Sequence, residues 1–368
     1  MFFLSGVILL LFVLRDVFLS VIPRGMNTAL CIAPFLVRRI FWPPFLLITS
    51  KISSPTWKAE VSSLFAPFIL VAMLIIWISL IAAAFGIIAL ALAPHYSPAV
   101  DSPMAAFYVS ASSVLTIGNT SDFSPRTGDV KFLMLGGALI GMVLTASVVS
   151  LMFGLIAAIQ PREAQVSIIS NLGGSPPSGI AILETYSRFH GSEFLHEFFD
   201  QCHHWCADVL ETHKSFPILP YFRSNDAFTS WLTALGAILD SIALMLAAAP
   251  ERESFSARVM FQLGCKLLSD FVAIFELTVA EQEECSDDEF HQLYLRLQFA
   301  GYSSRSEDET RANFRLLRLE YLCTHRALCS YLAVPATSLH SQHQELLPAL
   351  KLPVDVSTCN KNVAQIAR

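Results

Sequence analysis

Charged residues are absent from two long stretches of the chain, residues 61–94 and 132–160, which contain no Asp, Glu, Lys or Arg. A helix needs about 20 mainly apolar residues to cross a bilayer, and each stretch exceeds that length. Residues 1–22 form a third apolar run, which carries Arg15 and Asp16. No basic segment precedes this run and no small-residue cleavage site follows it, which favours a retained helix over a signal peptide. The pattern therefore predicts three transmembrane helices.

Arg15 and Asp16 are the only Asp, Glu, Lys or Arg residues inside these predicted spans. Ionisable groups at membrane depth are costly and often functional. Polar contacts to a neighbouring helix, or extension toward the nearer interface, explain the pair more simply. We favour this structural role.

A shorter apolar run, residues 104–115, lies between the two long spans. About 12 residues of helix cannot cross a bilayer, but they fit a re-entrant helix. Irregular backbone at membrane depth is tolerated only where protein buries it or where it lines a watery path. The residues that follow, beginning Thr116-Ile117-Gly118, are therefore expected at a pore or a site.

The chain beyond residue 160 shows a helical pattern without alternating strands, which predicts an all-helical domain over residues 161–340 and a flexible tail over 341–368. Residues 227–249 have Asp240 as their only charge and are long enough to span a membrane. A buried central helix is favoured over a fourth span, because the amphipathic neighbours need an apolar partner. The expected helices cover residues 177–189, 192–214, 226–249, 254–281, 287–301 and 307–333.

Two of these helices begin with the pattern of a capping box. Ser286 precedes Glu289 by three residues, and Ser306 precedes Glu309 by the same spacing. The serine side chain and the glutamate side chain then satisfy backbone N–H groups reciprocally.

The composition divides the chain into two halves. Of its 368 residues 54% are apolar and 15% charged, with a mean hydropathy of +0.55, whereas soluble domains carry about 25% charged residues. This argues against an ordinary soluble enzyme and against disorder.

Residues 1–160 hold 8 Lys and Arg against 5 Asp and Glu, and residues 161–368 hold 16 against 25. The acidic balance argues against nucleic acid as a partner, and the split predicts a membrane half followed by a soluble half.

Basic residues set the expected orientation. Residues 23–60 carry five Lys and Arg against the single Glu60, so the positive-inside rule places this loop in the cytoplasm. The N-terminus then faces outward, and the domain after residue 160 is cytoplasmic, beneath the plasma (inner) membrane. All eight cysteines fall on the predicted cytoplasmic side, where they stay reduced. Residues 33–48 mix aromatics with paired arginines and resemble a segment lying along the headgroups, with an aromatic belt as the alternative.

The order of span, short helix, Thr-Ile-Gly at residues 116–118 and span resembles the pore module of the potassium-channel superfamily, whose filter reads Thr-Val-Gly-Tyr-Gly-Asp. Asn119 stands at the tyrosine position and Thr120 at the second glycine position. Asp122 follows one residue late because Ser121 is extra.

Three segments of the second half, residues 161–184, 211–240 and 317–335, resemble the C-terminal region of a bacterial family of ion-channel-like membrane proteins, and this resemblance covers most of the chain, from about residue 16 to residue 335. That family has the same three-span pore layout and an all-helical cytoplasmic domain without an assigned activity. The resemblance implies an N-terminal span and basic loop over residues 1–60 and a pore domain over residues 61–160.

The resemblance implies a homotetramer in a lipid bilayer that conducts monovalent cations, potassium first among them, without a cofactor. In such filters four chains present rings of backbone carbonyls in place of the hydration shell of the ion. The implied filter residues are Thr116, Ile117, Gly118, Asn119 and Thr120.

Further pore residues follow from the same resemblance. Asp122 would form a carboxylate ring at the outer mouth, or else cap a turn. Gly141, Thr145 and Gly154 of the third span are expected at the inner cavity or gate. Close helix packing is an equal explanation for the two glycines, and bonding within its own helix is an alternative for Thr145.

Thr120 departs from the glycine of the filter pattern and motivates an alternative function. A non-conducting, membrane-anchored sensor or scaffold would retain the pore fold without the ion path. A cytoplasmic ligand or protein partner of the helical domain is compatible with either function.

A group of metal-binding residue types occurs in the helical domain, where Cys202, His203, His204, Cys206 and His213 lie close in sequence. Cysteine and histidine at helical spacing can hold zinc. No second ligand pair at metal spacing follows, so buried thiols and surface histidines are favoured. We expect no metal and no catalytic residues. The acidic run over residues 281–289 is interpreted as a solvated helix start.

Overall fold

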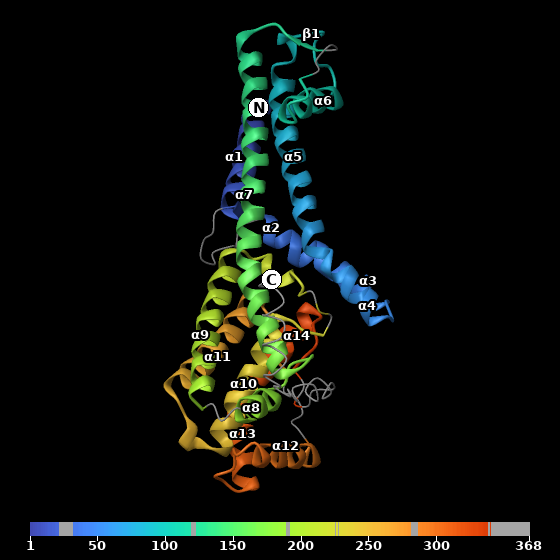
Figure 1. Ribbon diagram of the computed structural model, residues 1–368. Helices are drawn as coiled ribbons and strands as arrows, with labels where there is room; N and C mark the ends of the chain where they lie inside the picture. Colours follow the sequence, from blue (N-terminus) through green and yellow to red (C-terminus); the bar gives the residue numbers. More distant parts are fainter. Residues whose placement is uncertain are drawn as a thin grey trace, which may run out of the picture.

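The computed structural model describes residues 1–21, 32–118, 123–188, 192–224, 226, 228–280, 286–337 and 339. Within these residues the fold is all-helical apart from two strands of two residues each, as the sequence predicts (Figure 1). The predicted filter residues Asn119 and Thr120, the mouth residue Asp122 and the tail 341–368 lie outside the described residues.

Three long helices occupy the three predicted spans. They are α1 (Phe2–Val21), α5 (Phe65–Ala91) and α7 (Gly128–Gly173), and each is long and apolar enough to cross a membrane. Helix α1 packs along α5. Helix α7 continues without a break through Pro161, so it extends beyond the predicted end of its span and runs into the C-terminal helices (Figure 1).

Short helices connect α1 to α5 and leave the base of α5 at an angle (Figure 1). They expose several large apolar side chains, Phe35, Ile40, Leu47 and Ile48. Such exposure suits the predicted segment along the headgroups. These connecting elements are α2 (Ile32–Phe35), η1 (Leu36–Phe41), α3 (Trp42–Ser50) and α4 (Pro55–Ser63).

The helix α6 (Pro103–Val114) lies beside α5 at the end of the molecule that is far from the C-terminal helices (Figure 1). A turn η2 (Ala93–His95) and strand β1 (Tyr96–Ser97) precede it, and strand β2 (Ser124–Pro125) follows. The two strands pair antiparallel, so the segment that contains α6 begins and ends at neighbouring positions.

The remaining helices form a C-terminal bundle around α10 (Trp231–Ala248). Helix α10 is also apolar and long enough to cross a membrane, but 94% of its apolar window is buried, against 22% to 39% for the other three candidates. Protein covers it on all sides, as a central bundle helix requires. The other bundle elements are α8 (Gly179–Arg188), α9 (Ser192–Ser215), η3 (Leu219–Tyr221), η4 (Pro250–Arg252), α11 (Phe255–Phe275), α12 (Asp287–Phe299), α13 (Glu307–Leu319) and α14 (Leu322–Leu332).

Some predicted helix boundaries are wrong. Residues 307–333 form two helices, α13 and α14, because the chain turns at Glu320 and brings Tyr321 into the core. Helix α11 ends at Phe275, since Glu276 adopts a left-handed conformation with φ 54°. The capping box of Ser286 is confirmed, with both reciprocal bonds present. Ser306 caps α13 by accepting a hydrogen bond from the backbone of Glu309.

A cluster of aromatic rings joins the bundle to the long helices. Trp42 lies 4.7 Å from Phe65 and 4.9 Å from Tyr221, measured between ring centroids, and Phe275 lies 4.8 Å from Tyr331. The Trp42 indole nitrogen donates to the carbonyl of Tyr331 over 3.1 Å. Because this junction cluster belongs to one continuous apolar core, the bundle is packed against the long helices and not merely tethered to them.

Candidate functional site

A short helix, α6, covers the residues 104–115 for which the sequence predicts a re-entrant helix. Pro103 occupies its first turn, and the Ser102 hydroxyl accepts a hydrogen bond from the Ala105 N–H over 3.2 Å, which defines the start of the helix. At about 1.5 Å per residue its 12 residues span less than the roughly 30 Å thickness of a bilayer core.

Small residues bring α6 close to its two neighbours. A Cβ placed on Gly86 of α5 would lie 3.4 Å from the Ala106 backbone, and one on Gly137 of α7 would lie 3.1 Å from the Ser113 hydroxyl. That hydroxyl donates to the carbonyl of Met134 on α7. Helix α6 is therefore wedged between α5 and α7.

Gly141 permits the tightest contact in this arrangement. A Cβ at this position would lie 1.8 Å from the carbonyl oxygen of Val114, the last residue of α6. No side chain larger than hydrogen fits without moving one of the helices. The expected gate residue thus has a demonstrated packing role, in which it seats the end of α6 against α7.

The first residues of the predicted filter form the C-terminal cap of α6. The Thr116 N–H donates to the Ser113 carbonyl and the Ile117 N–H to the Ser112 carbonyl, each over 2.9 Å. This pair of bonds is a Schellman motif, in which the residue after the cap is left-handed. Thr116 has φ 56° there, which is uncommon for a β-branched residue.

Gly118 also has a positive φ, 71°, and a Cβ placed on it would meet no atom of the described residues within 4 Å. Leu115 and Ile117 are 47% and 65% exposed in the single chain. The described part of the predicted filter therefore projects from the end of α6 without cover from the other described residues.

The other two expected cavity or gate residues have different surroundings. The Thr145 hydroxyl donates to the Gly141 carbonyl over 3.0 Å, within its own helix. Gly154 faces the bundle, where a Cβ would lie 3.4 Å from the Phe216 ring. The three residues therefore do not converge on one point of the chain.

Arg162 connects α7 to the bundle and was not among the residues selected from the sequence. Its side chain is 2% exposed and donates to the carbonyls of Leu219 over 3.1 Å and Phe222 over 3.0 Å. It also pairs with Glu163 at 2.8 Å. The sequence feature that marks Arg162 is its position, because it is the first charged residue after the predicted span ends at residue 160.

His213 completes this connection. Its Nε2 lies 3.3 Å from Arg162, and its side chain is buried. Burial, and then the positive charge of Arg162, lowers the pKa of His213 well below 6.5. The ring is therefore neutral near pH 7 and can accept a hydrogen bond from the guanidinium.

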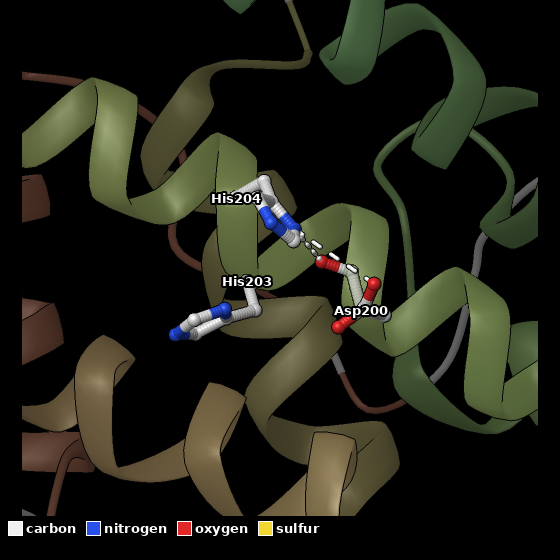
Figure 2. Close-up of side chains that lie close together, drawn as sticks. All are labelled: Asp200, His203 and His204. Atoms are coloured by element: carbon white, nitrogen blue, oxygen red, sulfur yellow. Dashed lines mark hydrogen bonds and ion pairs between the residues drawn. The ribbon is translucent and has the colours of Figure 1, made fainter.

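The candidate zinc ligands are separated on α9. Cys202 and Cys206 are buried, and burial raises the pKa of both thiols, that of Cys206 to about 12. His203 and His204 lie on the outer side, where they form a group with Asp200 whose ligand atoms lie within 4.8 Å of one another. Figure 2 shows His204 turned toward Asp200, while the His203 ring points away from that pair. The thiols and the imidazoles thus do not form one site.

Comparison of the chain with protein-family models, with curated proteins and with solved structures finds no match. The resemblance to potassium-channel pores therefore depends on the residues and on the helix arrangement alone.

Proposed function

We propose that this chain is one subunit of a homotetrameric cation channel in the plasma membrane, with a potassium-channel-like pore and a cytoplasmic helical bundle. The observation that carries the proposal is the position of α6 between α5 and α7, with the Thr116-Ile117-Gly118 segment at its C-terminal end. A short helix followed by irregular backbone is tolerated at membrane depth only beside protein or a water-filled path.

The electrostatics of α6 suit a cation. The C-terminal end of a helix carries a partial negative charge of roughly half an elementary charge. Four such ends around one axis would favour a cation at the centre. Asp122 would add a carboxylate from each chain at the outer mouth.

The exposed surface of α7 suits assembly with identical chains. Leu135, Leu139, Met142 and Phe153 form an apolar stripe at helical spacing, each at least 60% exposed. Under the proposed assembly, neighbouring subunits would cover this stripe together with Ile117.

Reversal potentials of the purified protein in planar bilayers test the proposal. We expect cation-selective current from the native chain and loss of most of it in Gly118→Ala, because alanine disfavours a positive φ. The mutation introduces no steric overlap with the described residues, since a Cβ at this position meets none of their atoms within 4 Å. Gly136→Ala is the matched control, as a Cβ there is equally uncontacted but lies in regular helix.

One structural observation favours the non-conducting alternative. Ile117 donates its N–H to the Ser112 carbonyl, so the segment starts as a helix cap with its amides directed back along α6. Confirmed tetramers without current at any cation gradient would support a scaffold. Current gained on replacing residues 116–122 with a Thr-Ile-Gly-Tyr-Gly-Asp filter would then show that the remaining pore fold is intact.

A further inference from the structure

A cavity of about 120 Å³ lies where α1, α5 and α7 meet the bundle. Residues of η3, α9 and α11 close it on the bundle side. Most of its walls are apolar, and include Leu70, Met73, Val148, Leu151, Ile218 and Ile274. An apolar cavity of roughly 150 Å³ stays dry and accepts small apolar molecules. The interior therefore suits an aliphatic segment better than water or a polar ligand.

Most of the polar groups in the walls form hydrogen bonds with other parts of the chain. The Trp77 indole nitrogen donates to Asp16 over 3.0 Å, and the Tyr221 hydroxyl bonds to that of Tyr331 over 2.8 Å. His213 is paired with Arg162. The buried Ser20 hydroxyl is the exception, since it has no hydrogen-bond partner among the described residues. A hydroxyl in an apolar cavity suits an ester carbonyl oxygen, which accepts one hydrogen bond.

The rim of the cavity is positively charged. Arg38 lines it, and Arg39 follows on the same turn of chain. Both guanidinium groups lie 3.8 Å from one carboxylate oxygen of Glu276, so the three side chains leave one net positive charge. The side chains of Arg39 and Glu276 are 70% and 69% exposed, and long exposed ion pairs of this kind are weak. An anionic group can therefore compete with Glu276.

We propose that this cavity binds an anionic phospholipid. A short stretch of one acyl chain would enter the apolar interior, and the phosphate would lie against Arg38 and Arg39. Two observations favour a lipid over a soluble anion. The cavity is bounded by the end of α1, the first part of α5 and the middle of α7, which are all helices of membrane-spanning length, and the neighbouring Phe35 and Ile40 expose apolar side chains that suit the headgroup boundary. The bound chain would contact α7 at Val148 and Leu151 and the bundle at Ile218, so the lipid would stabilise their attachment.

Native mass spectrometry of the delipidated full chain in detergent tests this proposal. The probes are dioleoyl phosphatidylglycerol, dioleoyl phosphatidylcholine and glycerol 3-phosphate. We expect one phosphatidylglycerol per chain at concentrations where the other two do not bind. Removing both charges in Arg38→Gln with Arg39→Gln should weaken binding about thirtyfold, given about 1 kcal/mol per basic residue near a membrane surface. Lys51→Gln, at the end of α3, removes a charge elsewhere on the same segment and should bind like the native chain.

Filling the cavity tests the acyl chain separately. Leu70→Trp adds bulk to the half-buried wall and should weaken phosphatidylglycerol binding without changing the charge of the rim. Val148→Phe repeats the test from α7 if the first variant is not monodisperse. Four outcomes would each overturn the proposal. The double arginine variant could bind phosphatidylglycerol like the native chain, or Lys51→Gln could lose as much binding as that variant. Glycerol 3-phosphate could bind as well as phosphatidylglycerol, or both filled variants could keep full binding. None of these measurements depends on whether the protein conducts ions.

Discussion

Asp16 lies buried in α1, and both of its carboxylate oxygens accept hydrogen bonds. Oδ2 accepts from the Trp77 indole nitrogen on α5 over 3.0 Å, and Oδ1 accepts from the Ile32 N–H over 2.6 Å. The acid that interrupts the first apolar run therefore has the structural role favoured from the sequence. It joins α1 to α5 and to the start of the connecting segment.

Removing this acceptor should destabilise the protein. We expect Asp16→Ala to cost about 2 to 3 kcal/mol, because two donors lose their partner in a buried site. Asp16→Asn keeps one acceptor oxygen and should cost less. Thermal unfolding in detergent, followed by intrinsic fluorescence, measures both. Equal midpoints for the native, Asn and Ala chains would contradict the role of these bonds.

Two buried histidines make the stability depend on pH. Burial lowers the pKa of His213 well below 6.5 and also lowers the pKa of His325. The folded chain then binds fewer protons than the unfolded chain, so the stabilisation is complete above about pH 6.5 and is lost as the pH falls.

We expect acidification from pH 7.5 to 5.5 to lower the thermal midpoint. Each buried histidine contributes roughly 1 kcal/mol per pH unit below its ordinary pKa. His213→Gln should therefore flatten this dependence, even if it lowers the midpoint at pH 7.5. His204→Gln changes an exposed residue of the same helix and should keep the native pH dependence. A native chain whose midpoint does not change between these pH values would contradict the burial argument.

At the scale of elements, the contact between α6 and α7 is the most sensitive to substitution. Gly141→Ala would place a methyl group 1.8 Å from the Val114 carbonyl, so the helices must separate. Overpacking of this kind costs about 1 to 3 kcal/mol. Gly136→Ala lies in the same helix with no atom within 4 Å of its Cβ. We expect a lower thermal midpoint for the first variant and little change for the second. Equal midpoints would show that α6 is not seated on α7 in this way.

The sequence predicts the elements that depend on local pattern. Three apolar runs and the short run at residues 104–115 become α1, α5, α7 and α6, since hydrophobic length is a local property. The division of residues 307–333 was missed because it depends on a distant contact. Tyr321 turns inward, where its hydroxyl donates to Asp240 of α10. No spacing within the segment reveals that partner.

At the scale of the molecule, the candidate site is only partly visible in the sequence. Thr116 and Gly141 could be selected because a resemblance marked their positions. The position of Arg162 directly after a predicted span is visible in the sequence, but its partners at Leu219 and Phe222 are not, since they are more than fifty residues away. The cavity also could not be predicted, because its walls come from segments far apart in the sequence, between Leu19 and Phe275. Features formed by segments that are distant in the sequence can be recognised only from the fold.

The burial of α10 within the bundle leads to a prediction about the whole architecture. If protein buries α10 on all sides, a fragment of residues 162–339 should fold in water despite containing a helix of membrane-spanning length. We expect it to remain in the soluble fraction and to be helical by circular dichroism. A fragment of residues 174–339 lacks Arg162 and the lower part of α7, and should melt at a lower temperature because the carbonyls of Leu219 and Phe222 lose their donor. Insertion of the longer fragment into membranes would instead make α10 a fourth span, and would place the helices after it on the opposite side of the bilayer.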